Sequence, residues 1–277
     1  MDNFTGKVSI VTGAASGIGK ALCEELGRKK AVVIAADINT EGVRKVASKI
    51  SKDGGRSIAT NLDVSQSEDV AEFINNTANE HGRLDYIFNN AGISVWGEVR
   101  DMDLSHWEKV IAVNLMGVVY GTSTAYSLMV KQGFGHIVNI ASIAGLIGFP
   151  TNISYATSKS AVVGLSTSLR FEGAELGVKV STVCPGYIDT GIYDASTYLR
   201  ADREKVIANI KFNMMDVKKA AHVILKGVTR NKAVITFPFY AGLLWWLYRF
   251  NPSFLNPFIR KTVMDFRAIR KKNSVLD

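Results

Sequence analysis

Apolar runs rich in β-branched residues alternate with amphipathic segments over most of the chain. The runs are continuously apolar, which is typical of strands covered on both faces of a sheet. Strands are predicted at Lys7–Thr12, Ala31–Ala36, Ser57–Asn61, Asp85–Asn89, Gly135–Ile140, Val178–Val183 and Lys232–Thr236. Helical periodicity lies between them at Ile18–Arg28, Glu41–Ser51, Ser67–His81, Leu104–Lys131, Asn152–Leu176 and Asp216–Thr229. This alternation predicts an α/β, Rossmann-type, doubly wound parallel sheet of about seven strands joined by right-handed crossovers.

The composition agrees with a single globular domain that carries an extension. Of the 277 residues, 47% are hydrophobic and 21% are charged, which excludes a disordered chain. No Pro/Gly/Ser-rich linker divides the sequence, so we expect one domain over 1–236 and a C-terminal helical extension over 237–277. Two distant cysteines and the lack of a secretory signal predict a cytoplasmic location. Four scattered histidines predict no metal site.

The net charge of +8 is concentrated near the C-terminus. From residue 249 onward, the sequence contains seven Lys and Arg residues and only two acidic residues, Asp265 and Asp277. The rest of the chain is nearly neutral. The sequence carries no recognised nucleic-acid-binding motif, so the charge does not indicate a nucleic-acid partner.

A glycine-rich turn joins the first strand to the first helix. Its sequence, Thr12-Gly13-Ala14-Ala15-Ser16-Gly17-Ile18-Gly19, lets the backbone turn tightly and approach a pyrophosphate. The following helix offers free N–H groups and the positive end of its dipole to an anion. The candidate phosphate-binding residues are Gly13, Ser16, Gly17, Ile18 and Gly19.

Asp37 closes the second predicted strand, 18 residues after Gly19. In a dinucleotide-binding fold, a carboxylate at this place accepts hydrogen bonds from the adenosine ribose and repels a 2′-phosphate. Neither Ser16 nor Ile38 supplies a cation for such a phosphate. NAD is therefore favoured as cofactor over NADP. The alternative role for Asp37 is to cap the helix that begins near Thr40.

The spacing Gly-x-x-x-Gly-x-Gly after a threonine resembles the short-chain dehydrogenase/reductase (SDR) family. Further matches follow in order between Lys7 and Thr236: Asp63-Val64, Asn89-Asn90-Ala91-Gly92, Asn114, Ser142, Tyr155-Ala-Thr-Ser-Lys159, Pro185-Gly186 and Thr190. The resemblance implies that Asp63 meets the adenine ring and Thr190 the nicotinamide carboxamide. The other cofactor contacts that it implies are Val64, Asn90, Ala91, Gly92, Tyr155, Lys159, Pro185, Gly186 and Ile188.

Tyr155 and Lys159 are four residues apart and share one face of a helix. A nearby ammonium favours phenolate and lowers the pKa of a tyrosine from its usual value of about 10. Such a tyrosine can exchange a proton with an alcohol as hydride is transferred. The resemblance adds Ser142, which would hold the substrate oxygen, and Asn114, which would position a water leading to Lys159. Each residue alone has an ordinary structural alternative, but their joint order favours a catalytic set.

The stretch Tyr187–Met215 lacks clear periodicity, and segments of such length are often lids. The resemblance implies that it closes over the substrate. Its aromatic residues and methionines predict an apolar substrate pocket. The alternative is that these side chains only pack the segment onto the body of the protein. The candidate substrate residues are Ser142, Ile143, Phe149, Tyr187 and Tyr193.

The C-terminal extension contains an uncharged run over 233–248, shorter than the roughly 20 apolar residues needed to span a bilayer. It holds the interface-type aromatic residues Tyr240, Trp245, Trp246 and Tyr248. Beyond it, an apolar stripe recurs at helical spacing with cations off the stripe: Leu255, Ile259, Thr262, Val263, Phe266 and Ile269. The extension then either contacts a membrane surface peripherally or packs on the body or a neighbouring subunit, roofing the pocket.

These observations predict an NAD-dependent SDR oxidoreductase acting on CH–OH donors. It would interconvert a secondary or lipophilic alcohol, of steroid, retinoid or lipid type, with its carbonyl by hydride transfer. The alternatives are an NADPH-dependent carbonyl reductase and a membrane-surface dinucleotide-binding protein without turnover. The resemblance also implies a homo-oligomer, either a dimer or a tetramer.

Overall fold

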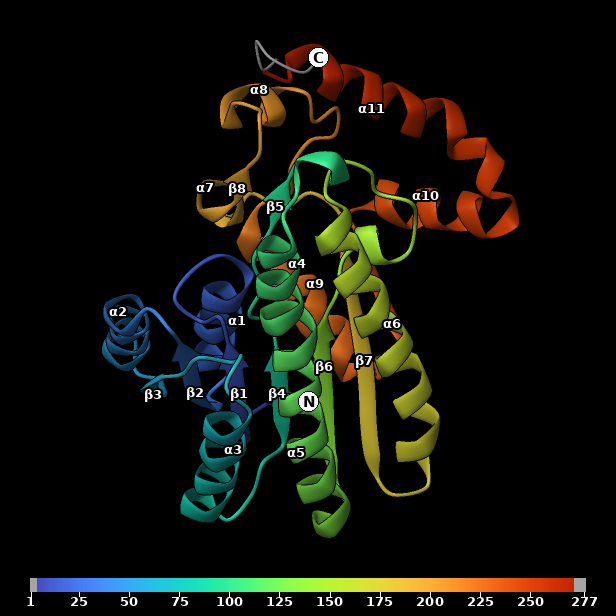
Figure 1. The fold of residues 1–277 in the computed structure, drawn as a ribbon. Coiled ribbons are helices and arrows are strands. Elements are labelled where there is room, and N and C mark those ends of the chain that lie inside the picture. The colour runs from blue at the N-terminus through green and yellow to red at the C-terminus, as the bar shows by residue number, and fades with distance from the viewer. Residues whose placement is uncertain (1–3, 272–277) are drawn as a thin grey trace.

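The computed structural model describes residues 4–271, with a seven-stranded parallel sheet at its centre (Figure 1). The strands are β1 (Val8–Thr12), β2 (Val32–Asp37), β3 (Arg56–Asn61), β4 (Tyr86–Asn89), β6 (Gly135–Ile140), β7 (Val178–Pro185) and β9 (Val234–Phe237). Their order is β3-β2-β1-β4-β6-β7-β9. The chain therefore builds outward from β1 in one direction and then, from β4, in the other. This confirms the predicted doubly wound fold, and its reversal point lies between β1 and β4.

Helices cover both faces of this sheet (Figure 1). On one face lie α1 (Gly17–Arg28), α2 (Thr40–Lys52) and α9 (Val217–Thr229). On the other lie α3 (Ser67–His81), α5 (Gly117–Gln132) and α6 (Ile153–Ala174). Two apolar layers result, one on each face, which explains why the strands read as continuously hydrophobic.

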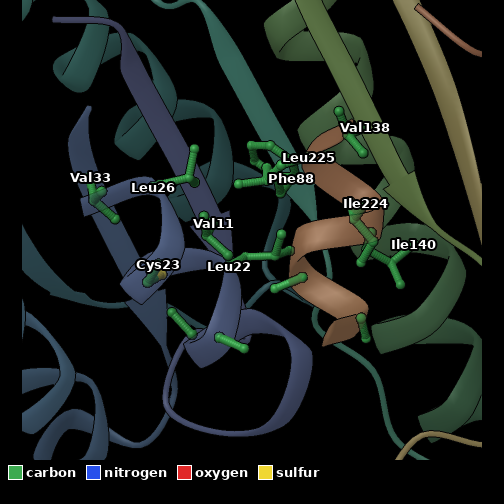
Figure 2. Packing of buried hydrophobic residues seen from close by; sticks show 14 of the residues in the cluster. Val11, Leu22, Cys23, Leu26, Val33, Phe88, Val138, Ile140, Ile224 and Leu225 are labelled. Carbon is green, nitrogen blue, oxygen red and sulfur yellow. The ribbon is translucent and has the colours of Figure 1, made fainter. Parts of the chain in front are cut away.

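The layer beneath α1 and α9 holds the first glycine turn in place. Leu22 and Leu26 of α1 and Ile224 and Leu225 of α9 are fully buried against the strands (Figure 2). Burial of each such side chain contributes about 1.5–3 kcal/mol relative to its exposure. The start of α1, where the glycines lie, is therefore anchored by its own apolar face.

The long helix predicted over Leu104–Lys131 is continuous but not uniform. It consists of α4 (Leu104–Ile111), a π-helical turn over Ala112–Met116, and α5. Asn114 lies inside the π-helical turn and is fully buried. Such turns are rare and often occur at functional sites.

The Tyr187–Met215 segment contains short elements that its sequence did not predict. These are α7 (Ile192–Ala195), β8 (Thr197–Tyr198) and α8 (Arg203–Ala208), and β8 pairs in parallel with β5 (Val95–Trp96). The two ends of the segment are held together, because Asp189 N–H donates to the Met215 carbonyl and Met215 N–H donates to the Tyr187 carbonyl. The segment is thus a closed loop that stands on the carboxyl edge of the sheet.

The C-terminal extension forms α10 (Phe239–Phe250), a 3-10 turn over Pro252–Leu255 and α11 (Asn256–Ile269). It lies across the top of the molecule, with the end of α11 close to α8 (Figure 1). Within residues 4–271, no helix combines the length and the hydrophobicity needed to cross a membrane.

Candidate active site

The glycine turn after β1 brings backbone close to the segment after β4. Gly13 and Gly17 have φ angles of 63° and 52°, in the left-handed region that favours glycine. A Cβ on Gly13 would lie 2.8 Å from Cα of Ala91. Asn90 Nδ2 donates to the carbonyls of Thr12, at 2.9 Å, and of Gly13, at 3.2 Å. The turn therefore leaves a space that is lined by backbone atoms, and side chains at the glycine positions would fill it.

A cleft of about 480 Å³ runs along this edge from Asp37 to Lys159. It is lined by most of the predicted cofactor residues: Gly13, Ser16, Gly17, Ile18, Asp37, Asp63, Val64, Asn90, Ala91, Gly92, Tyr155, Lys159, Pro185 and Thr190. Sequence reasoning missed Lys109 of α4, which also lines the cleft but carried no motif. The elongated cradle has the length and polar edges that a dinucleotide needs.

Three other predicted cofactor residues lie outside this cleft. Gly19 packs on the Gly13 carbonyl and supports the turn. Ile188 is buried in the core, and Gly186 lines a second pocket beyond Tyr155. In residues 4–271, the structure brings together no group of three or more His, Cys, Asp or Glu side chains that could hold a metal ion.

Asp37 bonds the glycine turn rather than the helix that follows it. Its Oδ2 accepts from Ala15 N–H at 2.9 Å, and its Oδ1 accepts from Asn39 N–H at 2.8 Å. The cap of α2 is Asn39, whose Oδ1 accepts from Gly42 N–H at 2.9 Å. A carboxylate has further lone pairs, so Asp37 can accept additional hydrogen bonds in the cleft.

Ser142 and Tyr155 come from different elements and meet beside the cleft. Ser142 follows β6, where its Oγ accepts from Ala144 N–H at 3.1 Å. Tyr155 lies in the first turn of α6. Burial raises the pKa of Tyr155, while the hydrogen bond with Ser142 opposes that rise. The direction differs from the lowering predicted from Lys159, because loss of solvation disfavours the phenolate.

Lys159 lies one helical turn after Tyr155, on the same face of α6. Its Nζ is 5.5 Å from the centre of the Tyr155 ring and donates to the Ile140 carbonyl at 2.8 Å. Burial lowers the pKa of this ammonium to about 8. The expected i, i+4 pair is present, but the ammonium is directed at the end of β6 as well as at the tyrosine.

Asn114 joins α4 and α5 to the loop after β4. Its Oδ1 accepts from Ile93 N–H at 2.8 Å, while its Nδ2 donates to the Ile93 carbonyl at 2.9 Å and to Ser158 Oγ at 3.2 Å. A Cβ on Gly92 would lie 3.4 Å from Asn114 Oδ1 and 3.5 Å from Lys159 Nζ. Asn114 therefore fixes the backbone beside the lysine.

A second, smaller pocket of about 60 Å³ lies between Tyr155 and the Tyr187–Met215 segment, which we call the lid. All five candidate substrate residues line it: Ser142, Ile143, Phe149, Tyr187 and Tyr193. We call it the inner pocket. Tyr155 lines both the cleft and the inner pocket, so its side chain lies where the two spaces meet.

The inner pocket also contains Trp96 and Asn152, which sequence reasoning missed. Trp96 reaches it because β5 pairs with the lid strand β8. Asn152 is 2% exposed and donates through Nδ2 to Ser94 Oγ at 2.8 Å. Its Oδ1 is buried and has no hydrogen-bond partner in the described part of the chain. Buried polar atoms are nearly always paired, so this unpaired oxygen is an exception, in a residue that lines the inner pocket.

A series of aromatic rings leads outward from the inner pocket. Phe149 contacts Tyr187, with ring centres 6.2 Å apart, and Tyr187 contacts Phe212 at 6.2 Å. Phe212 stacks on Tyr240 of α10 at 4.3 Å and meets Phe258 of α11 at 5.7 Å. An outer cavity of about 70 Å³ follows, lined by Trp96, Tyr187, Phe212, Phe258 and Phe266 among others. The C-terminal extension is thus the outer wall of this region.

The sequence matches the family model described as short chain dehydrogenase over residues 7–199. The chain is 34% identical over 222 residues to Uncharacterized oxidoreductase YxjF of Bacillus subtilis, covering 78% of this chain and 86% of that protein. It is 34% identical over 234 residues to an uncharacterized oxidoreductase of Staphylococcus aureus strain USA300, covering 84% of this chain and 96% of that protein.

Solved structures share this fold. A short chain dehydrogenase/reductase from Burkholderia phymatum, crystallised in complex with NAD, has a TM-score of 0.80 and 25% identity, with 100% of each chain covered. Levodione reductase has a TM-score of 0.75 over 85% of this chain and 97% of that chain. At 24% identity, the second likeness concerns the fold alone.

Proposed function

The chain belongs to the short-chain dehydrogenase family, and from this premise we propose that it is an NAD-dependent oxidoreductase of lipophilic alcohols. The proposed reaction interconverts a secondary or lipophilic alcohol with its carbonyl. One observation carries it: Tyr155, a proton-exchanging group, lies where the cleft meets a pocket lined by aromatic side chains.

NAD fits the residues of the cleft. The bare turn at Gly13 and Gly17 leaves room for a pyrophosphate at the start of α1. Asp37 offers a carboxylate to ribose hydroxyls and would repel a 2′-phosphate, and the neighbouring Ile38 brings no cation. The similar structure from Burkholderia phymatum, in complex with NAD, supports a nicotinamide dinucleotide as the cofactor. When bound, the nicotinamide ring supplies the hydride acceptor for oxidation and the hydride donor for reduction.

Tyr155 handles the proton of the reacting oxygen. In oxidation the carbinol C–H bond breaks with loss of hydride, and the hydroxyl proton passes to Oη of Tyr155 in its phenolate form. In reduction Tyr155 begins as the phenol, and both transfers reverse. Ser142 donates a hydrogen bond to the substrate oxygen and stabilises the negative charge that develops on that oxygen during the reaction. Both side chains line the inner pocket, so one substrate oxygen can meet both.

Lys159 and Asn114 support this exchange. The Lys159 ammonium beside the Tyr155 ring favours the phenolate once a proton has left, against the burial that disfavours it. Asn114 acts as a positioning residue, because it holds the Ile93 backbone beside Gly92 and hence beside Lys159.

The pocket indicates the substrate class. Its walls are mainly apolar and aromatic, and the outer cavity shares Trp96 and Tyr187 with the inner pocket. A substrate can therefore extend an apolar body past these two rings toward α11.

The test is NADH formation by the full chain with NAD⁺ over short alcohols, long-chain alcohols, steroids and retinol. Tyr155→Phe is expected to lower kcat by about a thousandfold while retaining NAD⁺ binding. Tyr126→Phe is the matched control, since that ring packs near Gly173 at the far end of α6. Turnover that survives Tyr155→Phe would contradict the mechanism. Turnover with NADP(H) alone would favour the carbonyl-reductase alternative, and NAD⁺ binding with no turnover would favour a binding protein.

A further inference from the structure

One side of α10 presents a row of large apolar side chains to solvent. Phe239, Leu243, Trp246 and Phe250 recur at steps of four, three and four residues and are 85%, 44%, 62% and 74% exposed. Phe254, in the turn that follows, is 55% exposed. We call these five residues the α10 face. A monomeric soluble protein rarely exposes such a contiguous apolar set without a partner.

The opposite side of α10 is already occupied. Ala241, Leu244, Trp245 and Tyr248 pack against residues that follow β6, including Ile143 of the inner pocket. The helix is therefore apolar on both sides, and only one side is covered by the fold. Its position is set by that covered side, so the α10 face is held outward as a fixed surface.

Aromatic rings on the α10 face form one continuous ladder. Trp246 and Phe250 have ring centres 6.3 Å apart with an interplanar angle of 17°, and Phe250 and Phe254 are 6.1 Å apart at 15°. Near-parallel neighbours of this kind make a broad surface rather than a slot for a single ligand. Aromatic side chains on one helix face are typical of helices that lie in the interfacial layer of a bilayer.

The second helix of the extension does not share this role. The apolar stripe predicted on α11 turns inward: Leu255 and Phe266 are 5% and 4% exposed. Phe266 packs with Trp96 and the lid, and Leu255 packs with Ile147 and α10. Of the two alternatives for this stripe, membrane contact or a roof over the pocket, the contacts of Leu255 and Phe266 favour the roof, while α10 supplies the exposed surface.

The α10 face lies in a stretch of the chain whose charged side chains are all positive. From residue 217 to residue 264 the sequence contains no Asp or Glu. Within the extension, this stretch carries the exposed cations Arg249, Arg260 and Lys261, of which Lys261 is paired with Asp265 at 3.1 Å. A second copy docked through the same surface would bring these cations toward one another, whereas an anionic lipid surface complements them.

We propose that the α10 face docks the protein on the surface of a membrane that contains anionic phospholipid. The aromatic ladder enters the headgroup layer, and the cations of the extension remain among the lipid phosphates. The outer cavity beneath α11 is then close to the bilayer. The proposal does not rest on the proposed reaction, since docking requires no substrate and no turnover.

The experiment is vesicle flotation of the full chain with phosphatidylcholine vesicles, with and without phosphatidylglycerol. We expect about 25-fold stronger partitioning onto the anionic vesicles, because Arg249 and Arg260 each contribute about fivefold when they lie near the surface. Trp246→Ser/Phe250→Ser is expected to lower partitioning by about tenfold or more. The matched control is Leu104→Ser/Phe171→Ser, whose residues on α4 and α6 are 78% and 82% exposed.

Three results would overturn the proposal. The first is no partitioning onto anionic vesicles at low salt, and the second is equal loss in the patch variant and the control variant. The third is a change of assembly state by sedimentation equilibrium in the patch variant, with vesicle binding unaltered, which would assign the α10 face to a second copy. Thermal melting and NAD⁺ binding of each variant separate loss of docking from loss of the fold.

Discussion

The backbone N–H of Tyr187 donates a 2.7 Å hydrogen bond to the hydroxyl of Tyr240. Tyr187 stands at the first end of the lid and lines the inner pocket, whereas Tyr240 lies in the first turn of α10. The same Tyr240 ring stacks on Phe212 near the other end of the lid. The C-terminal extension therefore holds the base of the lid, so the shape of the pocket depends on residues beyond the sheet.

Tyr240→Phe should loosen this base without altering the catalytic groups. The substitution leaves the Tyr187 N–H without its partner, which costs about 1–3 kcal/mol for a buried group. We expect a melting temperature lower by about 2–4 °C per kcal/mol and a raised KM for the alcohol. Tyr248→Phe removes a hydroxyl from the same helix and serves as control. Equal KM and melting temperature in wild type and Tyr240→Phe would refute the role of this bond.

Cofactor preference should depend on Asp37 and Ile38 at the end of β2. Ile38 is 67% exposed, so Ile38→Arg adds a cation at little structural cost. We expect that variant to improve kcat/KM for NADP⁺ relative to NAD⁺ by about tenfold, since the guanidinium can pair with a 2′-phosphate. Adding Asp37→Asn should increase the change further by removing the repelling charge. Steady-state kinetics with both cofactors measure the ratio, and an unchanged ratio would place the ribose elsewhere.

Lys159→Met should abolish turnover and yet stabilise the protein at neutral pH. Burial lowers the pKa of Lys159 to about 8, so keeping its charge inside the fold costs stability. Between pH 8 and the unfolded pKa of about 10.4, the unfolded state binds more protons, and stability of the wild type rises with pH. The variant should melt several degrees higher at pH 7, with a smaller difference at pH 10. A variant that melts lower at both pH values would contradict this balance.

Arg270→Ala should release the end of α11 from the body. Arg270 bonds both carboxylate oxygens of Asp101 at 2.9 Å, and the two side chains are only 7% and 3% exposed. Loss of such a buried pair costs about 3 kcal/mol. We expect faster hydrogen exchange along α11. Lys271→Ala, which breaks an exposed pair with Asp202, is the matched control and should cost less than about 1 kcal/mol.

The same pair gives the attachment of α11 a pH dependence. Hydrogen bonds from Arg270 lower the pKa of Asp101 below its usual value. A lowered carboxyl pKa stabilises the fold above the unfolded value of about 3.9, and that stability is lost as pH falls through the folded value. Hydrogen exchange of α11 in the wild type should therefore approach that of Arg270→Ala only in acid below about pH 4. A difference that persists at still lower pH would assign the attachment to apolar packing instead.

Local pattern was sufficient for the sheet and for the residues at its carboxyl edge. Strand periodicity, the glycine turn and the Tyr155–Lys159 spacing each span only a few residues. Parallel strands joined by right-handed crossovers then bring their carboxyl ends together. For this reason the cleft contains most of the cofactor residues that the sequence indicated.

Other features depended on pairings between distant segments. Trp96 enters the inner pocket only because β5 pairs with β8, and nothing near Trp96 in the sequence indicates that partner. Asn152 reads as an ordinary polar residue before a helix, and only its packing beside Ser94 leaves its oxygen unpaired. The pKa of Tyr155 likewise follows burial, which sequence spacing does not describe.

The extension shows this division most clearly. The sequence by itself determined that the extension is helical, that its first part is uncharged and aromatic, and that its second part carries an apolar stripe with cations beside it, because composition and periodicity are local properties. It did not determine which apolar side is covered, since hydrophobic attraction has no direction of its own and any apolar partner satisfies it. The tertiary structure decided that α11 turns Phe266 toward the lid and that α10 leaves Trp246 and Phe250 in solvent, through the contacts of Tyr240 and Arg270 with the body.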